Sequence, residues 1–426
     1  MGSKPHFVDV LVVASEAGHI LLENGAEISR VEDIMARISS YYGVDSGSFF
    51  VLSNGIFTTG QAEKIRSSGG QASTYANVAF IPIRGAQLAK VTAVNRLSYD
   101  ISAGKYTLEQ ARARLEEIKA IPFKSAWAQV LASAFGAAGF SAVFGGGFLD
   151  CAAAFVVGFI LYIFVLTVSG RYFSKIVAGV SNALLASLLC IAFWRIGFGS
   201  SLSNIIIGAV MPLIPGVPFV NGVRDLANSD YMAGLKRMTD AMLSFLCLAL
   251  GVSLSFILDG TLFGGVIYLS GMSVNPETAS LASQALAALI GTLAFAVLYG
   301  VDRQQYPAAG LIGIAGWLAY LICFRYAGMT APVATAVAAF LVSLLGRIAA
   351  VPTRCPAQVF LLSGLFTLVP GGGIFWCTYY LTSGQMALSF QTGFMAIKVA
   401  IAIVLGIVLA MELPQRLFSG RRTATH

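Results

Sequence analysis

Hydrophobic stretches long enough to cross a bilayer follow one another along most of this chain after Ser125. Ten are predicted, each about 20 residues long, which is the length that a helix needs to cross the hydrocarbon core. They lie near 126–144, 148–168, 176–194, 202–220, 240–258, 281–299, 307–325, 331–349, 357–378 and 391–411. Because only short loops separate them, the pattern indicates a membrane part that is all α-helical.

Residues 1 to about 120 show a different pattern of apolar and polar positions. Apolar residues recur at helical spacing from Leu11 to Ile38, which predicts amphipathic helices. Thr107 with Gln110 forms a capping box that starts a further helix. Short apolar runs that resemble strands lie at 49–52, 56–58 and 78–83. The sequence therefore predicts a small α+β domain, called the front domain below, ahead of the membrane part.

Two of the hydrophobic stretches are interrupted by the same Pro-Gly pair. Pro215-Gly216 interrupts the fourth stretch and Pro370-Gly371 the ninth, 155 residues later. Adding this offset to the first five stretches gives ranges close to the last five, so the membrane part is predicted to be a five-helix unit present twice. Matching breaks in two halves of a membrane chain are typical of the substrate site of a transporter, formed by discontinuous helices.

An odd number of helices per unit predicts that the two units enter the membrane from opposite sides, as inverted repeats. The positive charges agree with this topology. Beyond residue 120, only Arg195 and Arg325 fall on the side opposite the front domain, and Lys398 falls within the last stretch. The other twelve lie on the front-domain side: Lys124, Arg171, Lys175, Arg224, Lys236, Arg237, Arg303, Arg347, Arg354, Arg416, Arg421 and Arg422. The expected location is the inner (cell) membrane, with both termini in the cytoplasm.

Composition supports an integral membrane protein. The 426 residues are 57% hydrophobic and only 11% charged, and the net charge is +7. The mean hydropathy is +0.78. Basic residues are scattered over short loops, so no nucleic-acid partner is expected. The six cysteines show no C-x-x-C spacing, and no Walker A motif is present, which disfavours transport driven by ATP.

One group of possible metal ligands stands in the front domain. Glu16, His19 and Glu23 share one helical face, but a solvated polar face is the favoured interpretation. No metal and no cofactor is expected.

The first break carries polar chemistry close to it. Asn221 could add an amide contact to a substrate, and Arg224 is suited to a carboxylate. Asp225 could take a substrate ammonium, or it could pair with Arg224 and have only a structural role. Pro215 and Gly216 would present free backbone groups to the substrate, unless the prolines only kink the helix.

The second break offers backbone and aromatic surface instead of charge. Its backbone is bare over several residues, because only glycine allows a close approach of the main chain to a ligand. The predicted substrate-binding residues of this arm are Pro370, Gly371, Gly372, Gly373, Trp376 and Tyr379. One asymmetric site between the two breaks is therefore expected.

Four charged residues are candidates for coupling transport to protons. Asp225, Asp230 and Asp240 lie near the first break. Lys398 lies inside the last hydrophobic stretch, where a charge suggests function but could also extend its side chain to the interface.

Two passages of the chain resemble the threonine/serine exporter family. One runs from Ala17-Gly18 through Gly25-Ala26 to Arg30-Val31-Glu32. The other runs from Pro215-Gly216-Val217-Pro218 through Arg224-Asp225-Leu226 to Gly234 and Arg237. Ser229 stands where the family usually has glycine. The resemblance covers the whole chain and implies export of small polar metabolites, coupled to the proton gradient, by a protein that is not an enzyme. Relatives split into two chains imply dicarboxylate export, notably of succinate.

The sequence thus predicts three parts: the front domain at 1–120 and two membrane repeats at 121–265 and 276–426. The expected partners are a small amino acid or dicarboxylate, protons and membrane lipid, while a homo-oligomer is left open. Two other classes of function remain: a front domain that acts as an enzyme or regulatory module on a membrane anchor or gate, and a passive channel.

Overall fold

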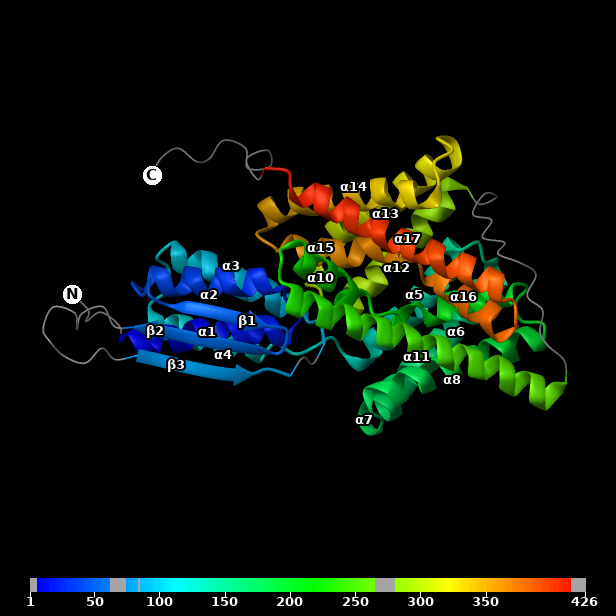
Figure 1. Ribbon diagram of the computed structural model, residues 1–426, viewed down its shortest axis with the longest axis horizontal. Helices are drawn as coiled ribbons and strands as arrows, with labels where there is room; N and C mark the ends of the chain where they lie inside the picture. Colours follow the sequence, from blue (N-terminus) through cyan, green and yellow to red (C-terminus); the bar gives the residue numbers. More distant parts are fainter. Residues whose placement is uncertain (1–5, 62–73, 83–84, 265–279, 415–426) are drawn as a thin grey trace, which may run out of the picture.

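The computed structural model describes residues 6–61, 74–82, 85–264 and 280–414. The predicted linker between the two membrane repeats lies within 265–279, outside the described residues. The molecule is elongated, with the front domain at one end and the membrane helices at the other (Figure 1).

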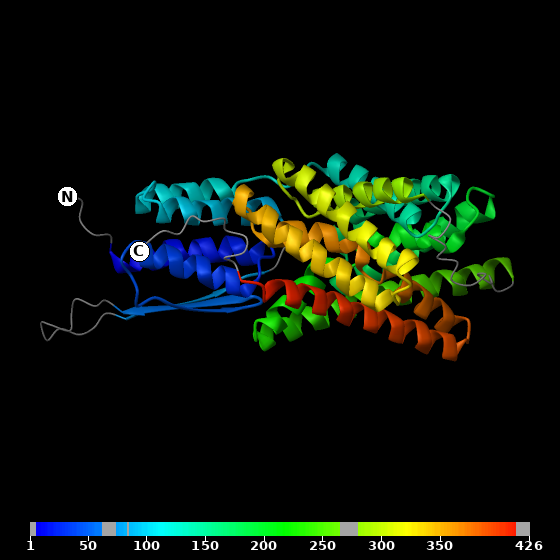
Figure 2. The ribbon, with the colours of Figure 1, turned by 90° about the horizontal axis from the view of Figure 1, so that it is seen from above.

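The front domain has three layers (Figure 2). The strands β1 (Ser48–Leu52), β2 (Gly55–Gln61) and β3 (Thr74–Phe80) form an antiparallel sheet in sequence order. The helices α1 (Phe7–Glu23) and α2 (Ile28–Tyr41) cover one face of this sheet, and α3 (Leu88–Ser102) and α4 (Leu108–Lys119) lie beyond them. The other sheet face exposes Phe50, Phe57 and Val78, which lie side by side in the strand register.

Local sequence signals explain these elements. The apolar residues spaced along α1 and α2 form the core, and Leu11, Val31 and Ile38 are fully buried. Thr107 and Gln110 form the expected capping box at the start of α4, because each side chain is hydrogen-bonded to the backbone of the other residue. The strands expected from the sequence are present with slightly different ends.

Within the described residues, the membrane part contains eight long apolar helices and two bent pairs, or up to ten spans if each bent pair is one span. The bounds of the first set are α5 (Ala126–Val143), α6 (Phe148–Phe164), α7 (Gly170–Tyr172), α8 (Lys175–Arg195), α9 (Leu202–Val210), α10 (Gly216–Ala227) and α11 (Tyr231–Phe263). Those of the second set are α12 (Leu281–Leu298), α13 (Tyr306–Leu321), α14 (Ala331–Thr353), α15 (Ala357–Gly364), α16 (Gly371–Thr382) and α17 (Met386–Met411). The fourth and ninth stretches are bent by 63° and 42° at their breaks, so both are discontinuous as predicted.

The 155-residue offset reappears in the helix ends. The two ends of α5 and of α10 each map onto the two ends of α12 and of α16. A left-handed residue follows each bent pair, Ser229 with φ 67° and Gly384 with φ 76°. The serine therefore adopts the backbone conformation for which glycine is the less strained residue.

Some predicted helix bounds were too narrow. The fifth stretch was expected to begin at residue 240, but α11 begins at Tyr231 and has 33 residues. The tenth was expected at 391, but α17 begins at Met386. In α11 the first helical turns include the polar residues Lys236 and Arg237, which a search for apolar stretches leaves out. The extra residues of α17, from Met386 to Phe390, are mainly apolar, so polarity does not explain that difference.

Candidate functional site

The two breaks have the same local geometry. Pro215 has φ −78° and ψ 59°, and Pro370 has φ −75° and ψ 48°. The N–H of Gly216 donates to the carbonyl of Ile214 at 2.8 Å, and the N–H of Gly371 donates to Val369 at 2.7 Å. Each break is therefore an inverse γ-turn centred on the proline, whose ring already fixes the required φ.

The breaks pack directly against each other. A Cβ atom at Gly216 would overlap the ring of Phe366, and a Cβ atom at Gly371 would lie 2.7 Å from Ile214 and 2.8 Å from Met211. Phe366 and Met211 are themselves related by the 155-residue offset, so the two contacts are reciprocal. Reciprocal contacts of this kind are what a two-fold relation between two units produces.

The crossing of the breaks is closed in this structure. A cavity of about 20 Å³ remains there, lined mainly by apolar residues that include Ile214, Gly371 and Phe375. That volume accommodates about one water molecule. Trp376 and Tyr379 are buried in a cluster of aromatic rings, with their ring centroids 5.6 Å apart. An amino acid would need the helices to separate before it could bind between the breaks.

The charged residues of the first arm lie away from the crossing. Arg224 follows Gly216 by eight residues, which is about 12 Å along the helix axis. It forms an ion pair with Glu27 of the front domain at 2.8 Å. Asp225 instead pairs with Arg237 of α11 at 3.1 Å. The described side chains thus do not form the internal Arg224–Asp225 pair that the sequence left open.

A turn of the front domain, residues 24–28 between α1 and α2, reaches both repeats. The carbonyl of Gly25 accepts a hydrogen bond from Asn221 of α10 at 2.9 Å and one from Gln358 of α15 at 2.8 Å. Gln358 also donates to the side chain of Asn221 at 2.9 Å. One carbonyl is therefore held by side chains from both halves of the membrane part.

The same turn is held by the buried ion pair. Arg237 donates to the carbonyl of Ala26 at 2.9 Å, and the N–H of Ile28 donates to Asp225 at 3.5 Å. Arg237 and Asp225 are both almost fully buried. Because removing one partner of such a pair leaves an uncompensated charge, the contact is expected to be sensitive to mutation.

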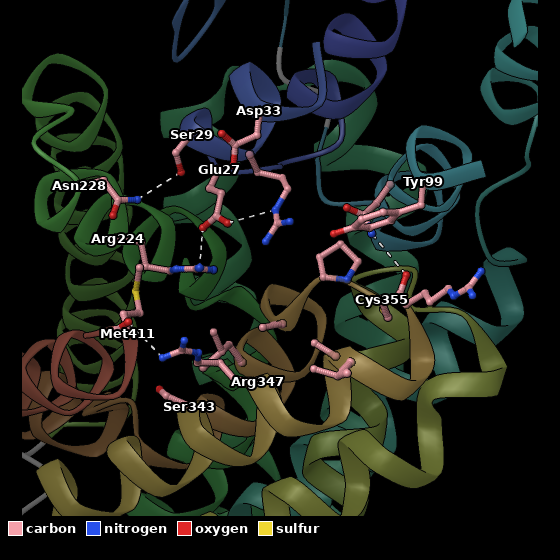
Figure 3. Close-up of a pocket in the computed structure, with 18 of the residues that line it drawn as sticks. Glu27, Ser29, Asp33, Tyr99, Arg224, Asn228, Ser343, Arg347, Cys355 and Met411 are labelled. Carbon is pink, nitrogen blue, oxygen red and sulfur yellow. Dashed lines mark hydrogen bonds and ion pairs between the residues drawn. The ribbon is translucent and has the colours of Figure 1, made fainter. Parts of the chain in front are cut away.

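A large cavity lies beside this turn, between the front domain and membrane helices of both sets. Its volume is about 880 Å³, within the range of small-molecule sites. Five cationic and three acidic side chains line it: Arg30, Lys105, Arg224, Arg347 and Arg354, with Glu27, Asp33 and Asp100. Figure 3 shows Arg224 reaching in from α10, with Arg347 on the opposite wall.

The side chain of Arg224 has N–H groups without a hydrogen-bond partner among the described residues. Its side chain is only 7% exposed, one nitrogen contacts Glu27, and the Nε and Nη1 atoms have no hydrogen-bond partner there. The hydroxyl of Ser343, also on the cavity wall, is likewise unpartnered and buried. A buried guanidinium with free N–H groups is suited to bind a carboxylate.

The other candidate residues have separate settings. Asp240 pairs with Lys175 at 3.2 Å, and both side chains are partly exposed. Lys398 is exposed and lies over the ring of Phe394, 4.7 Å from its centroid. Asp230 is half-buried at the start of α11, where burial raises its pKa although Arg237 opposes the shift. Of these three, only Asp230 lies close to the turn of the front domain.

The glycines of the second arm differ in how closely their neighbours approach. A Cβ atom at Gly372 would meet its neighbours at ordinary distances, the nearest being Phe144 at 3.5 Å, whereas at Gly373 it would lie 3.2 Å from Ala396. Close approach is therefore required at Gly371 and is only slight at Gly373.

The sequence analysis did not single out Glu27 or Gln358. Glu27 follows the Gly25-Ala26 pair of the first family-like passage, and Gly25 has φ 85°, so the turn that places Glu27 was marked by its glycine. Glu32 of the same passage accepts the N–H of Val51 at 3.0 Å, and burial raises its pKa. Gln358 carries no local signal, because its role depends on contacts 137 and 333 residues away.

The fold and the site define a multi-pass membrane protein with two broken helices that cross. Comparison with known families gives the assignment. A family model described as "Putative threonine/serine exporter" matches residues 12–258, and a second one, described as "Threonine/Serine exporter, ThrE", matches 284–412. The chain belongs to the threonine/serine exporter family, which is a family of membrane transporters and not of enzymes.

Individual relatives agree with this family. The chain is 24% identical to a threonine/serine exporter of Corynebacterium glutamicum over 96% of its own length and 83% of the relative's. It is 26% identical to an uncharacterized protein of Schizosaccharomyces pombe, over 70% of this chain but only 42% of that protein. A probable succinate transporter subunit of Klebsiella aerogenes is 24% identical over 56% of this chain and 90% of its own length. No solved structure matches.

The packing of the breaks predicts a sharp difference between two glycines. Gly216→Ala forces the ring of Phe366 to move and is expected to destabilise the protein by about 1–3 kcal/mol. Gly372→Ala meets only ordinary contacts and is expected to leave stability almost unchanged. The midpoint of thermal unfolding of the purified proteins measures both. In a Phe366→Ala background, which lacks the ring, adding Gly216→Ala should lower the midpoint much less than it does in the unmodified protein. Equal midpoints for the two glycine variants would contradict the close packing of the two helix breaks against each other.

Proposed function

We propose that this protein is a secondary exporter of small polar metabolites that carry a carboxylate, with threonine and serine as the first candidates. The observation that carries this proposal is Arg224, a residue that lines the large cavity and whose buried guanidinium has two unpartnered nitrogens among the described residues. The names of the bacterial relatives support the same substrate class.

The proposed mechanism is alternating access by two inverted repeats. In this proposal both termini and the front domain are cytoplasmic, the membrane is the inner membrane, and the large cavity is the cytoplasmic entrance. The substrate binds Arg224 first and then moves to the crossing of Gly216 and Gly371, once the helices there separate. Two observations support a two-fold relation: the reciprocal contacts of the breaks, and the 155-residue offset that maps the ends of α5 and α10 onto those of α12 and α16.

Proton coupling is proposed at Asp225. Its carboxylate is fully buried, accepts the N–H of Ile28 and pairs with Arg237. A proton on Asp225 would remove the ion pair and loosen the turn of the front domain. The other three candidates are weaker. Asp240 and Lys398 lie on exposed surface, and Asp230 is only half-buried.

The charge of the cavity keeps two substrates in the proposal. The five cationic and three acidic side chains that line the cavity favour an anionic substrate, as a dicarboxylate exporter requires. Asp33 and Glu27 on the same walls could contact an ammonium group, which a zwitterion such as threonine requires. Counterflow with labelled amino acids and dicarboxylates separates them, since only a true substrate on the opposite side accelerates exchange.

The role of Arg224 predicts a loss of transport. Arg224→Gln is expected to lower export at low substrate concentration about tenfold or more, because a hydrogen bond to a charged group contributes about 1.5–3 kcal/mol. The measurement is initial export from vesicles loaded with labelled threonine, serine or succinate. Arg171→Gln, an equal charge change at an exposed position of α7, is the matched control.

Glu27→Gln distinguishes binding from structural support. It removes the partner of Arg224 while leaving the guanidinium in place, and it is expected to retain substrate binding.

Unchanged export by a folded Arg224→Gln protein would overturn the assignment of Arg224.

A second candidate function is favoured by the hydrogen bonds to Gly25. The front domain is proposed to act as a regulatory gate, since its turn joins Asn221 of the first repeat to Gln358 of the second. Rocking of one repeat against the other would have to break at least one of these bonds.

The gate predicts a gain in transport rate. Gln358→Ala removes one of the two bonds to Gly25 and is expected to raise export at saturating substrate by about twofold to tenfold, the range that a net hydrogen bond of about 0.5–1.5 kcal/mol allows. Gln284→Ala is the control, because Gln284 is equally buried and hydrogen-bonded but does not touch the turn. A rate that falls equally in both variants would indicate structural damage and contradict the gate.

A further inference from the structure

A second cavity lies where the front domain joins the membrane part. Its volume is about 340 Å³. Its walls come from four segments of the chain: α3, α4, the linker from 121 to 124, and the loop from 300 to 302 between α12 and α13. This cavity is separate from the large one, and no residue lines both.

Hydrogen bonds hold these walls in place. The N–H groups of Leu88 and Ala89 at the start of α3 donate to the carbonyls of Tyr299 and Gly300 at 3.0 and 2.9 Å. Gln87 donates to the carbonyls of Ile121 and Pro122, both at 3.1 Å. These hydrogen bonds join the start of α3 to the linker and to the loop from 300 to 302. Three of the four wall segments are therefore fixed relative to one another.

The charge of the cavity is positive. Arg96, Arg114 and Lys124 line it, against Asp302 as the only acid among its lining residues. Burial lowers the pKa of Lys124, the nearby Arg303 lowers it further, and Asp302 opposes both. Arg114 forms an ion pair with Glu117, so the three cations of the cavity are compensated only in part.

The cavity lies at the level where the spans begin. Lys124 directly precedes the Ser125 cap of α5, and Asp302 directly precedes the span that contains α13. Close to Lys124, the Phe123 and Trp127 side chains are 39% and 66% exposed. Exposed aromatic residues at span ends are typical of the interface between the hydrocarbon core and the headgroups.

We propose that this cavity binds the phosphate group of an anionic phospholipid, with Arg96, Arg114 and Lys124 around the headgroup and the acyl chains along the face of Trp127. The chemistry required is a phosphate at the membrane surface, which a basic pocket at a span end is suited to hold. Free phosphate or a soluble phosphate ester also presents anionic phosphate oxygens but lacks the chains. A bound lipid would fasten the front domain to the membrane part, whatever the transported substrate is.

The test uses the full-length protein in detergent and titrates it with phosphatidylglycerol. Phosphatidylcholine, glycerol 3-phosphate and inorganic phosphate form the other arms, and bound lipid is counted by native mass spectrometry. Phosphatidylglycerol is expected to bind in preference to all three. The double variant R96Q/K124Q is expected to bind it about tenfold to thirtyfold more weakly, from about 1 kcal/mol for each cation near the anionic surface.

The control is R171Q/K175Q, which removes two cations close to the start of another span. It is expected to bind phosphatidylglycerol as the unmodified protein does. Equal weakening in both double variants would overturn the site, because the effect would then be one of net charge. Tight binding of free phosphate without a preference for phosphatidylglycerol would overturn the assignment to lipid. A thermal unfolding midpoint without lipid, measured for each variant, shows that the proteins are folded.

Discussion

The contact between the two helix breaks determines the arrangement of the membrane part. A broken helix in a bilayer leaves backbone groups without partners, and these must be satisfied within the protein. Here each break closes as an inverse γ-turn at Pro215 or Pro370, and each glycine that follows accepts a bulky side chain from the other break. Gly216 and Gly371 thus allow two interrupted helices to cross closely, and the remaining helices surround that crossing.

The front domain is attached to this arrangement through one short turn. Because Gly25 is bound by both repeats and Glu27 by Arg224, the turn contacts the parts that would have to move during transport. The same ion pair leaves Arg224 with unused donors on the cavity wall. In the proposed function, substrate recognition and attachment of the front domain therefore depend on the same side chain, Arg224.

Much of the fold could be predicted because it depends on local signals. The apolar stretches, the capping box at Thr107 and the Pro-Gly pairs are all visible in short windows of sequence, and the 155-residue offset relates the helix ends. The family resemblance also held. The helix ends near Tyr231 and Met386 were misplaced; at Tyr231 the reason is that a hydropathy window does not register the polar turn with Lys236 and Arg237.

The site could be predicted only in part. Arg224 and Asp225 were identified as charged residues near a break, but their partners Glu27 and Arg237 depend on tertiary contacts that no local pattern records. The expectation of one site between the breaks assumed that the charged groups face the crossing. The length of α10 instead places Arg224 toward the front domain, at the wall of a cavity formed by segments distant in the sequence.

The central claim is that the two repeats move against each other beside the turn of the front domain. The most direct measurement is the distance between spin labels at Asn228 of the first repeat and Val351 of the second, which lie on the walls of the large cavity. In lipid nanodiscs, two distance populations are expected, and a transported substrate should change their proportions. A single population that does not change with substrate, in labelled protein that still transports, would contradict the account.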